Sequence, residues 1–122
     1  MTPFGEKIRD LRRQHGVSQK TMAADLGVSA AYLSALEHGR RGVPSWFMLQ
    51  KIIGYFNIIW DEAEELQRLA ETSHPRVVID TGGLSPAATG FANRLSDAIA
   101  KLSEDEIATL NARLEEALAR RG

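Results

Sequence analysis

The chain has 122 residues, of which 43% are hydrophobic and 25% are charged, the composition of an ordinary globular protein. That length suffices for one compact domain and an appendage, but not for two full domains. No apolar run approaches the roughly 20 residues that span a bilayer, and the N-terminal residues lack the apolar core of a signal peptide, so we expect a cytoplasmic protein without a membrane segment. The absence of cysteine excludes disulfides, thiolate nucleophiles and cysteine-based zinc sites.

The two halves of the chain differ in charge. The formal net charge is −1, which by itself argues against binding to nucleic acid. Residues 1–58, however, carry eight basic and four acidic side chains, a net charge of +4. Residues 59–122 carry seven basic and twelve acidic side chains, a net charge of −5. This asymmetry predicts that the first half faces a polyanion while the second half has another role.

Four helices are predicted in the first half from their apolar spacing and their caps. They cover residues 2–15, 19–26, 30–38 and 46–56. The last three begin after the serines Ser18, Ser29 and Ser45, and the first three are stopped by the glycines Gly16, Gly27 and Gly39. Asn57 is expected to end the fourth helix in a left-handed conformation.

A fifth helix and a linker are predicted next. Asp61 and Glu64 have the spacing of a cap and its third helical position, so this helix should open at Asp61 and reach about Glu71. We expect residues 73–84 to form a linker with one short extended stretch, since residues 76–80 are strand-like in composition. The sequence leaves open whether that stretch pairs with its copy in a second subunit or remains plain linker.

The last part of the chain is predicted to be a helical hairpin. Ser85-Pro86 opens one helix, and Ser103 with Glu106 forms the capping box of the next. Each helix carries one apolar stripe: Ala88, Phe91, Ala92, Leu95, Ile99 and Leu102 on the first, and Ile107, Leu110, Leu114, Ala117 and Leu118 on the second. Such a short segment cannot bury both stripes by itself, so it should pack on the first domain or on another chain.

Residues 17–41 carry the functional motif. A helix, a turn centred on Gly27 and a second helix make a helix-turn-helix. Ala23 is small where the two helices cross, and Leu33 and Leu36 face inward. The expected fold class is therefore all-α: a five-helix helix-turn-helix domain, a linker and a helical hairpin, at residues 1–72, 73–84 and 85–122.

The stretch from Phe4 to Ile58 resembles the Cro/cI-type (XRE) helix-turn-helix family of DNA-binding transcriptional regulators. The matching residues are Leu11-Arg12, Ser18-Gln19, Ala23, Gly27-Val28-Ser29, Leu36-Glu37-His38-Gly39-Arg40 and Pro44-Ser45. The resemblance covers roughly half of the chain. It implies binding to double-stranded DNA, with residues 30–38 as the recognition helix in the major groove.

The resemblance also assigns roles to single residues. Gln19 would hold a phosphate at a helix N-terminus, and Arg40 and Arg41 would clamp further phosphates. Arg12 and Glu37 match an internal salt bridge of the family, which makes Arg12 structural. The complete set of expected DNA-binding residues is Ser18, Gln19, Lys20, Ser29, Ala30, Ala31, Tyr32, Ser34, Ala35, His38, Arg40 and Arg41.

The recognition helix departs from the family's usual composition. Family members often carry Gln, Arg or Asn early in this helix, and this chain has small residues and a tyrosine there, so bidentate reading of a base is not available. Ala30 and Ala31 can contact thymine methyl groups, and Tyr32 and Ser34 can form single hydrogen bonds. Specificity should therefore depend on water, DNA shape and the spacing of a dimer.

The sequence gives little support for metal binding, for base stacking by tryptophan or for catalysis. The three histidines lack metal-ligand spacing, so we expect no metal and no cofactor. Trp46 and Trp60 are interpreted as core packing or a partner surface, and Glu62, Glu64 and Glu65 as a solvated helix face. With no cysteine, no histidine–carboxylate motif and no phosphate-binding loop, an enzyme is the weakest hypothesis.

The leading hypothesis is a dimeric repressor that binds a palindromic operator and associates with the bacterial nucleoid through DNA. The expected dimerisation residues lie in the hairpin: Phe91, Leu95, Ile99, Leu102, Ile107, Leu110 and Leu114. One alternative is an antitoxin or other interaction module whose acidic C-terminal half binds a partner protein. Another is a hairpin that caps the fourth and fifth helices of its own chain. The sequence gives no operator, target gene or effector.

Overall fold

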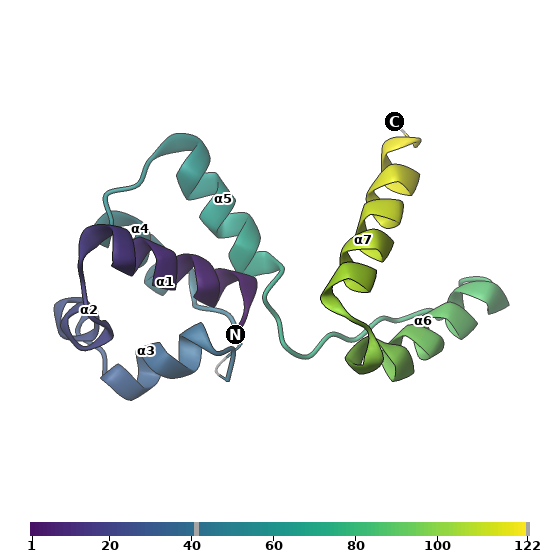
Figure 1. The fold of residues 1–122 in the computed structure, drawn as a ribbon, viewed down its shortest axis with the longest axis horizontal. Helices are drawn as coiled ribbons and strands as arrows, with labels where there is room; N and C mark the ends of the chain where they lie inside the picture. The colour runs from purple at the N-terminus through teal and green to yellow at the C-terminus, as the bar shows by residue number, and fades with distance from the viewer. Residues whose placement is uncertain (41, 122) are drawn as a thin grey trace. The chain divides into compact units, whose positions relative to one another are not determined.

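All regular elements among the described residues, 1–40 and 42–121 of a computed structural model, are helical (Figure 1). The predicted all-α fold class is confirmed. The chain divides into two compact units, of which the first is Met1–Val77 and the second begins at Val78. The finer division into domain, linker and hairpin remains a prediction. Among the described residues no helix is long and apolar enough to cross a membrane.

Five helices form the first unit: α1 Pro3–His15, α2 Gln19–Leu26, α3 Ala30–Glu37, α4 Trp46–Tyr55 and α5 Trp60–Glu71. Side-chain hydroxyls begin the first four, each accepting a hydrogen bond from a backbone N–H three residues on; the acceptors are Thr2, Ser18, Ser29 and Ser45. Gly16 and Gly27 end α1 and α2 with φ of 64° and 76°. The predicted caps Ser18, Ser29 and Ser45 and the predicted stops Gly16 and Gly27 are confirmed because they depend only on neighbouring residues, whereas Thr2, expected inside the first helix, is its cap.

The predicted start of α5 is wrong. The helix begins at Trp60, after Ile59, and no side chain caps it, so Asp61 lies inside the first turn instead of before it. Burial of Ile58 fixes where the chain turns back, and the turn is made by Asn57 at φ 55°, as predicted, and by Trp60 at φ 56°. Asp61 in the first turn still complements the positive end of the helix dipole.

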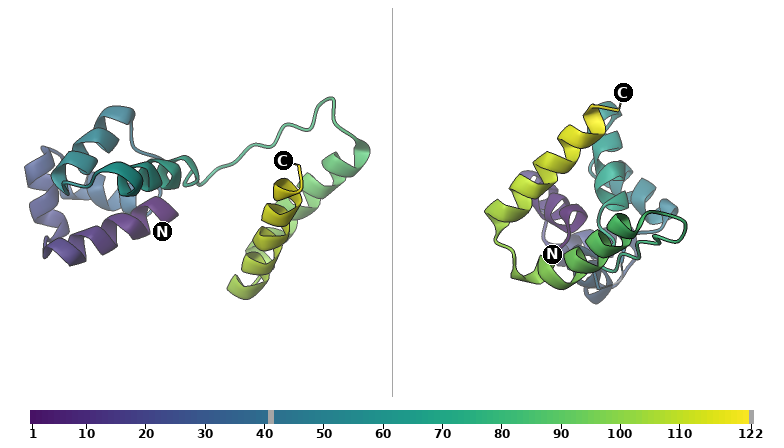
Figure 2. Two further views of the ribbon diagram at one scale, coloured as in Figure 1. Left: turned by 90° about the horizontal axis from the view of Figure 1, so that it is seen from above. Right: turned by 90° about the vertical axis from the view of Figure 1, so that its right-hand side faces the viewer.

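The core of the first unit lies where the five helices meet. In Figure 1, and seen from above in Figure 2, α1 packs along α5; on its other side α1 also contacts α3. The buried apolar side chains are Phe4, Ile8, Leu11, Met22, Ala23, Leu26, Leu33, Leu36, Leu49, Ile52, Phe56, Ile58, Leu66 and Ala70. This core therefore holds α2 and α3 against a support made of α1, α4 and α5.

The second unit is a hairpin of α6 Pro86–Ala98 and α7 Glu104–Ala119, joined by a 3-10 turn, η1, at Ile99–Lys101. The first helix is thus shorter than its apolar stripe, which continues through the turn. The capping box is confirmed: the Ser103 N–H donates to Glu106 Oε1 at 2.9 Å, and the Glu106 N–H donates to Ser103 Oγ at 3.1 Å. These bonds to Ser103 hold the pKa of the Glu106 carboxyl below its ordinary value. Residues 76–80 form no strand.

Candidate nucleic-acid interface

The outer face of α3 is exposed while its inner face is packed. Leu33 and Leu36 are each 1% exposed and point into the core, and Ala23 on α2 is buried beside them. On the other side of α3, Ala30 and Ala31 are exposed. Figure 1 shows α2 and α3 together at one edge of the first unit, with α1 between α3 and α5. An exposed surface that includes these two small side chains is therefore available to a partner.

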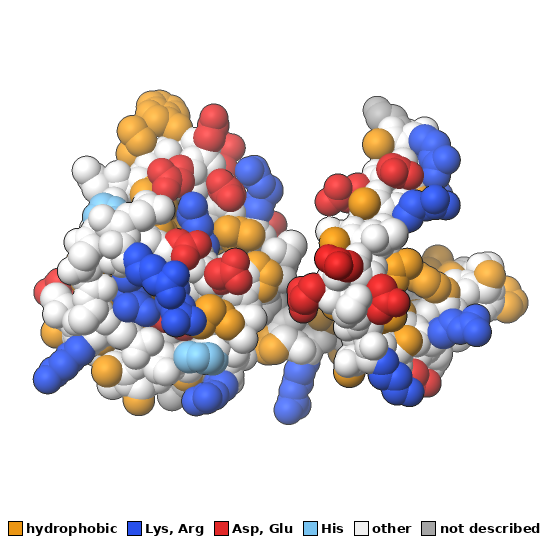
Figure 3. Space-filling model, viewed as in Figure 1, with side chains coloured by type: hydrophobic (Ala, Val, Ile, Leu, Met, Phe, Trp, Pro, Cys, Tyr) orange, Lys and Arg blue, Asp and Glu red, His pale blue; other side chains and the backbone are white. Residues whose placement is uncertain are grey.

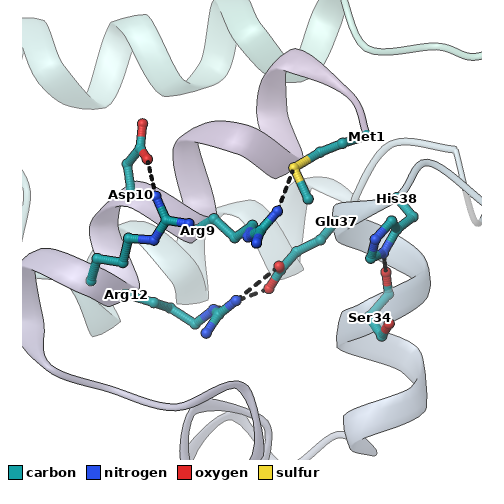
Figure 4. A network of polar contacts seen from close by, with 8 residues as sticks. Met1, Arg9, Asp10, Arg12, Ser34, Glu37 and His38 are labelled. Carbon is teal, nitrogen blue, oxygen red and sulfur yellow. Dashed lines mark hydrogen bonds and ion pairs between the residues drawn. The ribbon is translucent and has the colours of Figure 1, made fainter.

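An ion pair anchors the C-terminal end of α3 to α1 (Figure 4). Arg12 Nη2 donates to Glu37 Oε1 at 3.0 Å, and Arg12 Nε donates to Glu37 Oε2 at 3.1 Å. The side chains are 15% and 2% exposed, respectively. The two parallel bonds use the planar fork of the guanidinium, which fixes direction as well as distance. The geometry agrees with the structural role that the resemblance assigned to Arg12.

A close backbone contact strengthens this anchor, and no sequence pattern pointed to it. Gly5 of α1 lies so near the backbone of Glu37 that a Cβ on Gly5 would overlap the Glu37 carbonyl. The Thr2 N–H also approaches that carbonyl oxygen, at 3.4 Å. The available signal was a glycine inside a predicted helix, where glycine is unfavourable and usually has a packing reason.

The structure brings the predicted DNA-binding residues of α2 and α3 together on one unit and exposes them to different degrees. Most of the set is exposed: Ser18, Lys20, Ser29, Ala30, Ala31, His38 and Arg40. The half-buried members are Gln19, Tyr32, Ser34 and Ala35. Arg41 lies outside the described residues.

The N-termini of α2 and α3 are arranged alike. Ser18 Oγ accepts from the Thr21 N–H at 3.0 Å, and Ser29 Oγ accepts from the Tyr32 N–H at 3.0 Å. Each serine thus satisfies the third N–H of its helix, and the first two N–H groups have no partner within the helix by the geometry of a helix start. Such N-termini favour anions, because the N–H groups and the helix dipole both attract negative charge. Exposed Lys20 adds a positive charge in the first turn of α2.

Two side chains of α4 donate hydrogen bonds to α2. Lys51 Nζ donates to the Leu26 carbonyl oxygen at 2.9 Å, at the C-terminus of α2. The Tyr55 hydroxyl donates to Asp25 Oδ2 at 2.7 Å. Burial, this hydrogen bond and the negative charge of Asp25 all raise the pKa of Tyr55 above its ordinary value. Lys51 therefore serves the structure of α2.

Basic side chains also extend over α1. In Figure 3 a group of lysine and arginine side chains covers the part of the first unit where α1 runs. Arg9 and Arg13 of α1 are exposed, and Arg13 forms only a surface ion pair with Asp10, at 3.8 Å. Surface pairs of this kind contribute little to stability, so the charge of Arg13 is available to a polyanion.

The interpretation of Trp46 and Trp60 as core residues is wrong, because both side chains are exposed. Their interpretation as a partner surface stays a prediction. Trp46 is 66% exposed and packs edge-on against Phe47, and Trp60 is 80% exposed. Both are the first residues of their helices, α4 and α5. Among the described residues no group of three or more histidine or acidic side chains is placed to hold a metal ion.

Comparison with known proteins places this geometry in context. Residues 3–58 match the model of a family described as "Helix-turn-helix domain". The chain is 31% identical over 61 residues to the uncharacterized HTH-type transcriptional regulator RghRB of Bacillus subtilis (strain 168), a match over 50% of this chain and 44% of that protein. It is 40% identical over 52 residues to the HTH-type transcriptional repressor RghR of the same organism, over 43% of this chain and 38% of that protein.

The family match lies within the first unit. The chain covers less than half of the length of either relative. No solved structure matches the chain.

Proposed function

We propose that the chain, whose residues 3–58 match a helix-turn-helix domain family and resemble its XRE type, is a DNA-binding transcriptional repressor that acts as a dimer on a palindromic operator. The observation that carries the proposal is the exposed outer face of α3, held on α1 by the Arg12–Glu37 pair. A reading helix must be both exposed and rigidly oriented, because base contacts depend on its placement within the major groove.

The composition of α3 supports a particular mode of reading. Ala30 and Ala31 carry only a methyl group, so the helix backbone can lie close to the floor of the groove and contact thymine methyl groups. Tyr32 and Ser34 supply single hydrogen-bonding groups. Without a bidentate side chain, each base contact discriminates weakly. Operator choice then depends on DNA shape, bridging water and half-site spacing.

Phosphate contacts supply most of the affinity in this proposal. The N-termini of α2 and α3 each offer N–H groups to one phosphate, and Gln19 and Lys20 flank the first. Arg40, exposed just after α3, and Arg41 bind the backbone next to the recognition helix. Together these groups fix the register of the domain on DNA without selecting a base.

Dimeric binding follows from the geometry of such readers. Two recognition helices about 34 Å apart enter successive major grooves on one face of the duplex, which requires a two-fold symmetric operator. Repression is favoured over activation because one relative carries the name of a repressor.

The test is binding to the DNA upstream of the chain's own gene, followed by footprinting and by fluorescence anisotropy on the protected duplex. Ala31→Glu places a carboxylate against the bases, and we expect it to weaken specific binding about a hundredfold or more, since like charges and an unpaired acceptor then face the groove. Arg68→Ala is the matched control, because it changes the net charge by the same −1 on the exposed side of α5. Equal binding by the parent and Ala31→Glu would refute the assignment of α3.

A further inference from the structure

The hairpin of the second unit exposes the side chains that should form its core. Not one described residue from position 78 onward is buried. Phe91 is 67% exposed, Leu110 52% and Leu114 56%. These side chains line the inside of the angle between α6 and α7, which Figure 3 shows as a hydrophobic strip. The strip borders a groove of about 440 Å³, and its lining is almost wholly apolar.

The apolar residues that line the groove have the periodicity of a helix-packing surface. Along α7 the apolar residues Ile107, Leu110, Leu114 and Ala117 alternate three and four positions apart, the repeat of a coiled-coil seam. The stripe of α6 has the same repeat at Ala88, Phe91 and Leu95, and its apolar side chains continue beyond the helix at Ile99 and Leu102. Two helices with such seams leave a trough that a third helix with the same repeat fills by knobs-into-holes packing.

The charges of α7 favour an antiparallel copy of the same helix as the occupant of the groove. Its first turn carries Glu104, Asp105 and Glu106, whereas Arg120 and Arg121 follow its last residue, with Glu115 and Glu116 about one turn before them. An antiparallel copy of α7 brings each acidic end beside the other copy's basic end, whereas a parallel copy brings like charges together. In the antiparallel arrangement Arg113, which lines the groove near the middle of α7, approaches Arg113 of the other copy, and Glu115 and Glu116 approach the acidic first turn of the other copy.

We propose that the groove between α6 and α7 is filled by α7 of a second copy of this chain, in an antiparallel register. Ile107 lies opposite Ala117 of the second copy, and Leu110 lies opposite Leu114. In that register Glu104 and Glu106 flank Arg120 of the second copy. The same two-fold axis relates both contacts, so the interface is self-complementary and closes at a dimer of hairpins.

The inference specifies the dimer contact that the proposed function requires, and its test is made without DNA. Failure to dimerise and failure to bind an operator are thus separate results. Sedimentation of the full chain compares the parent with Leu110→Glu, in the seam, and Ala112→Glu, on the opposite side of α7. We expect a dimer for the parent and Ala112→Glu, and at least a hundredfold weaker association for Leu110→Glu because a carboxylate is then buried unpaired. A monomeric parent would overturn the proposal and leave the groove to a different protein.

Disulfide trapping tests the register, since the natural chain has no cysteine. In the antiparallel register two Ala117→Cys chains hold their thiols about 15 Å apart along the seam, from a rise of about 1.5 Å per residue, so they cannot bond to each other. A mixture of Ala117→Cys and Ile107→Cys chains should form a disulfide-linked dimer in mild oxidant. Cross-linking of Ala117→Cys with itself would establish a parallel pair and overturn the register. Absence of any cross-link in the mixture would place the contact elsewhere.

Charge reversal gives an independent measurement on folded protein. Arg120→Glu should weaken the dimer about tenfold, since it replaces an attraction by a repulsion at two symmetric positions. Adding Glu104→Lys to the same chain should restore most of the affinity. In a parallel pair Arg120→Glu would only exchange one like-charge contact for another, so an unchanged dissociation constant contradicts the proposal.

Discussion

The backbone N–H of Phe4 donates a buried hydrogen bond to the hydroxyl of Ser73, at 2.9 Å across 69 positions of sequence. Ser73 in turn donates to the Leu69 carbonyl oxygen, at the end of α5. Its side chain is therefore the link between the first turn of α1 and the last turn of α5. The Phe4 N–H has no partner within its own helix, so Ser73 supplies the bond that a buried donor requires.

We expect Ser73→Ala to lower the free energy of unfolding of the first unit by about 1–3 kcal/mol, because it leaves the Phe4 N–H buried without an acceptor. Urea unfolding followed by circular dichroism measures the change. Thr72→Ala, at the exposed neighbouring position, is the control and should change stability by less than about 0.5 kcal/mol. Equal stability of Ser73→Ala and the parent would mean that water replaces the hydroxyl.

Removing either member of the Arg12–Glu37 pair should destabilise the first unit by about 3–5 kcal/mol, because the remaining charge is stranded in a mostly buried position. Arg12→Lys should lie between Arg12→Ala and the parent, since an ammonium cannot make two parallel bonds. Thermal melting measures Arg12→Ala, Arg12→Lys and Glu37→Ala. Asp10→Ala removes an exposed ion pair and serves as the control. A variant at Arg12 that melts like the parent but does not bind DNA would assign Arg12 to the interface.

Gly5 and Gly54 provide a matched pair of glycine-to-alanine substitutions inside helices. Gly5→Ala should destabilise strongly, by at least about 2–3 kcal/mol, because the new methyl group collides with backbone atoms of Glu37, which cannot move aside without shifting α3. Gly54→Ala meets no atom within contact distance and should stabilise α4 by about 0.5–1 kcal/mol. Chemical denaturation of both variants checks the signs. A neutral Gly5→Ala would show that α1 and α3 can separate without cost.

Arg40→Ala should weaken binding to operator and to random duplexes by the same factor, because phosphate contacts carry no base information. The plot of log affinity against log salt should flatten by about 0.9 for each phosphate group that a subunit no longer neutralises. The same expectation applies to Arg41→Ala. Anisotropy titrations at several salt concentrations measure the slopes, with Arg68→Ala as the control. An unchanged slope with altered base preference would show that the arginine reads a base.

The raised pKa of Tyr55 predicts a loss of stability in alkali. The neutral hydroxyl bonded to Asp25 contributes its full stabilisation below the ordinary tyrosine pKa of about 10, and this contribution disappears as the pH rises through the raised pKa of the folded state. In a Tyr32→Phe background Tyr55 is the only tyrosine, so tyrosinate absorbance reports it directly. Asp25→Asn should lower the midpoint, and Asp10→Asn should not. A midpoint insensitive to Asp25→Asn would contradict the assigned cause.

Features that depend on neighbouring residues could be predicted from the sequence. A serine at Ser18, Ser29 or Ser103 can satisfy an N–H three residues later whatever the rest of the chain does, and Gly16 and Gly27 supply a left-handed conformation at low cost. The all-α class, the helix-turn-helix and the hairpin follow from these signals together with apolar periodicity. Family resemblance added the pairing of Arg12 with Glu37, which spacing alone does not indicate.

Only the tertiary structure decided the features that join distant segments. The contact of Gly5 with Glu37 and the bond from Phe4 to Ser73 connect parts of the chain that no local pattern relates. Burial of Ile58 moved the start of α5 ahead of the cap expected at Asp61. Trp60 is exposed, although its large aromatic side chain suggested that it packs in the core. In each case the free energy of filling one shared core outweighs the preference of a single residue, and that core exists only once the five helices have assembled.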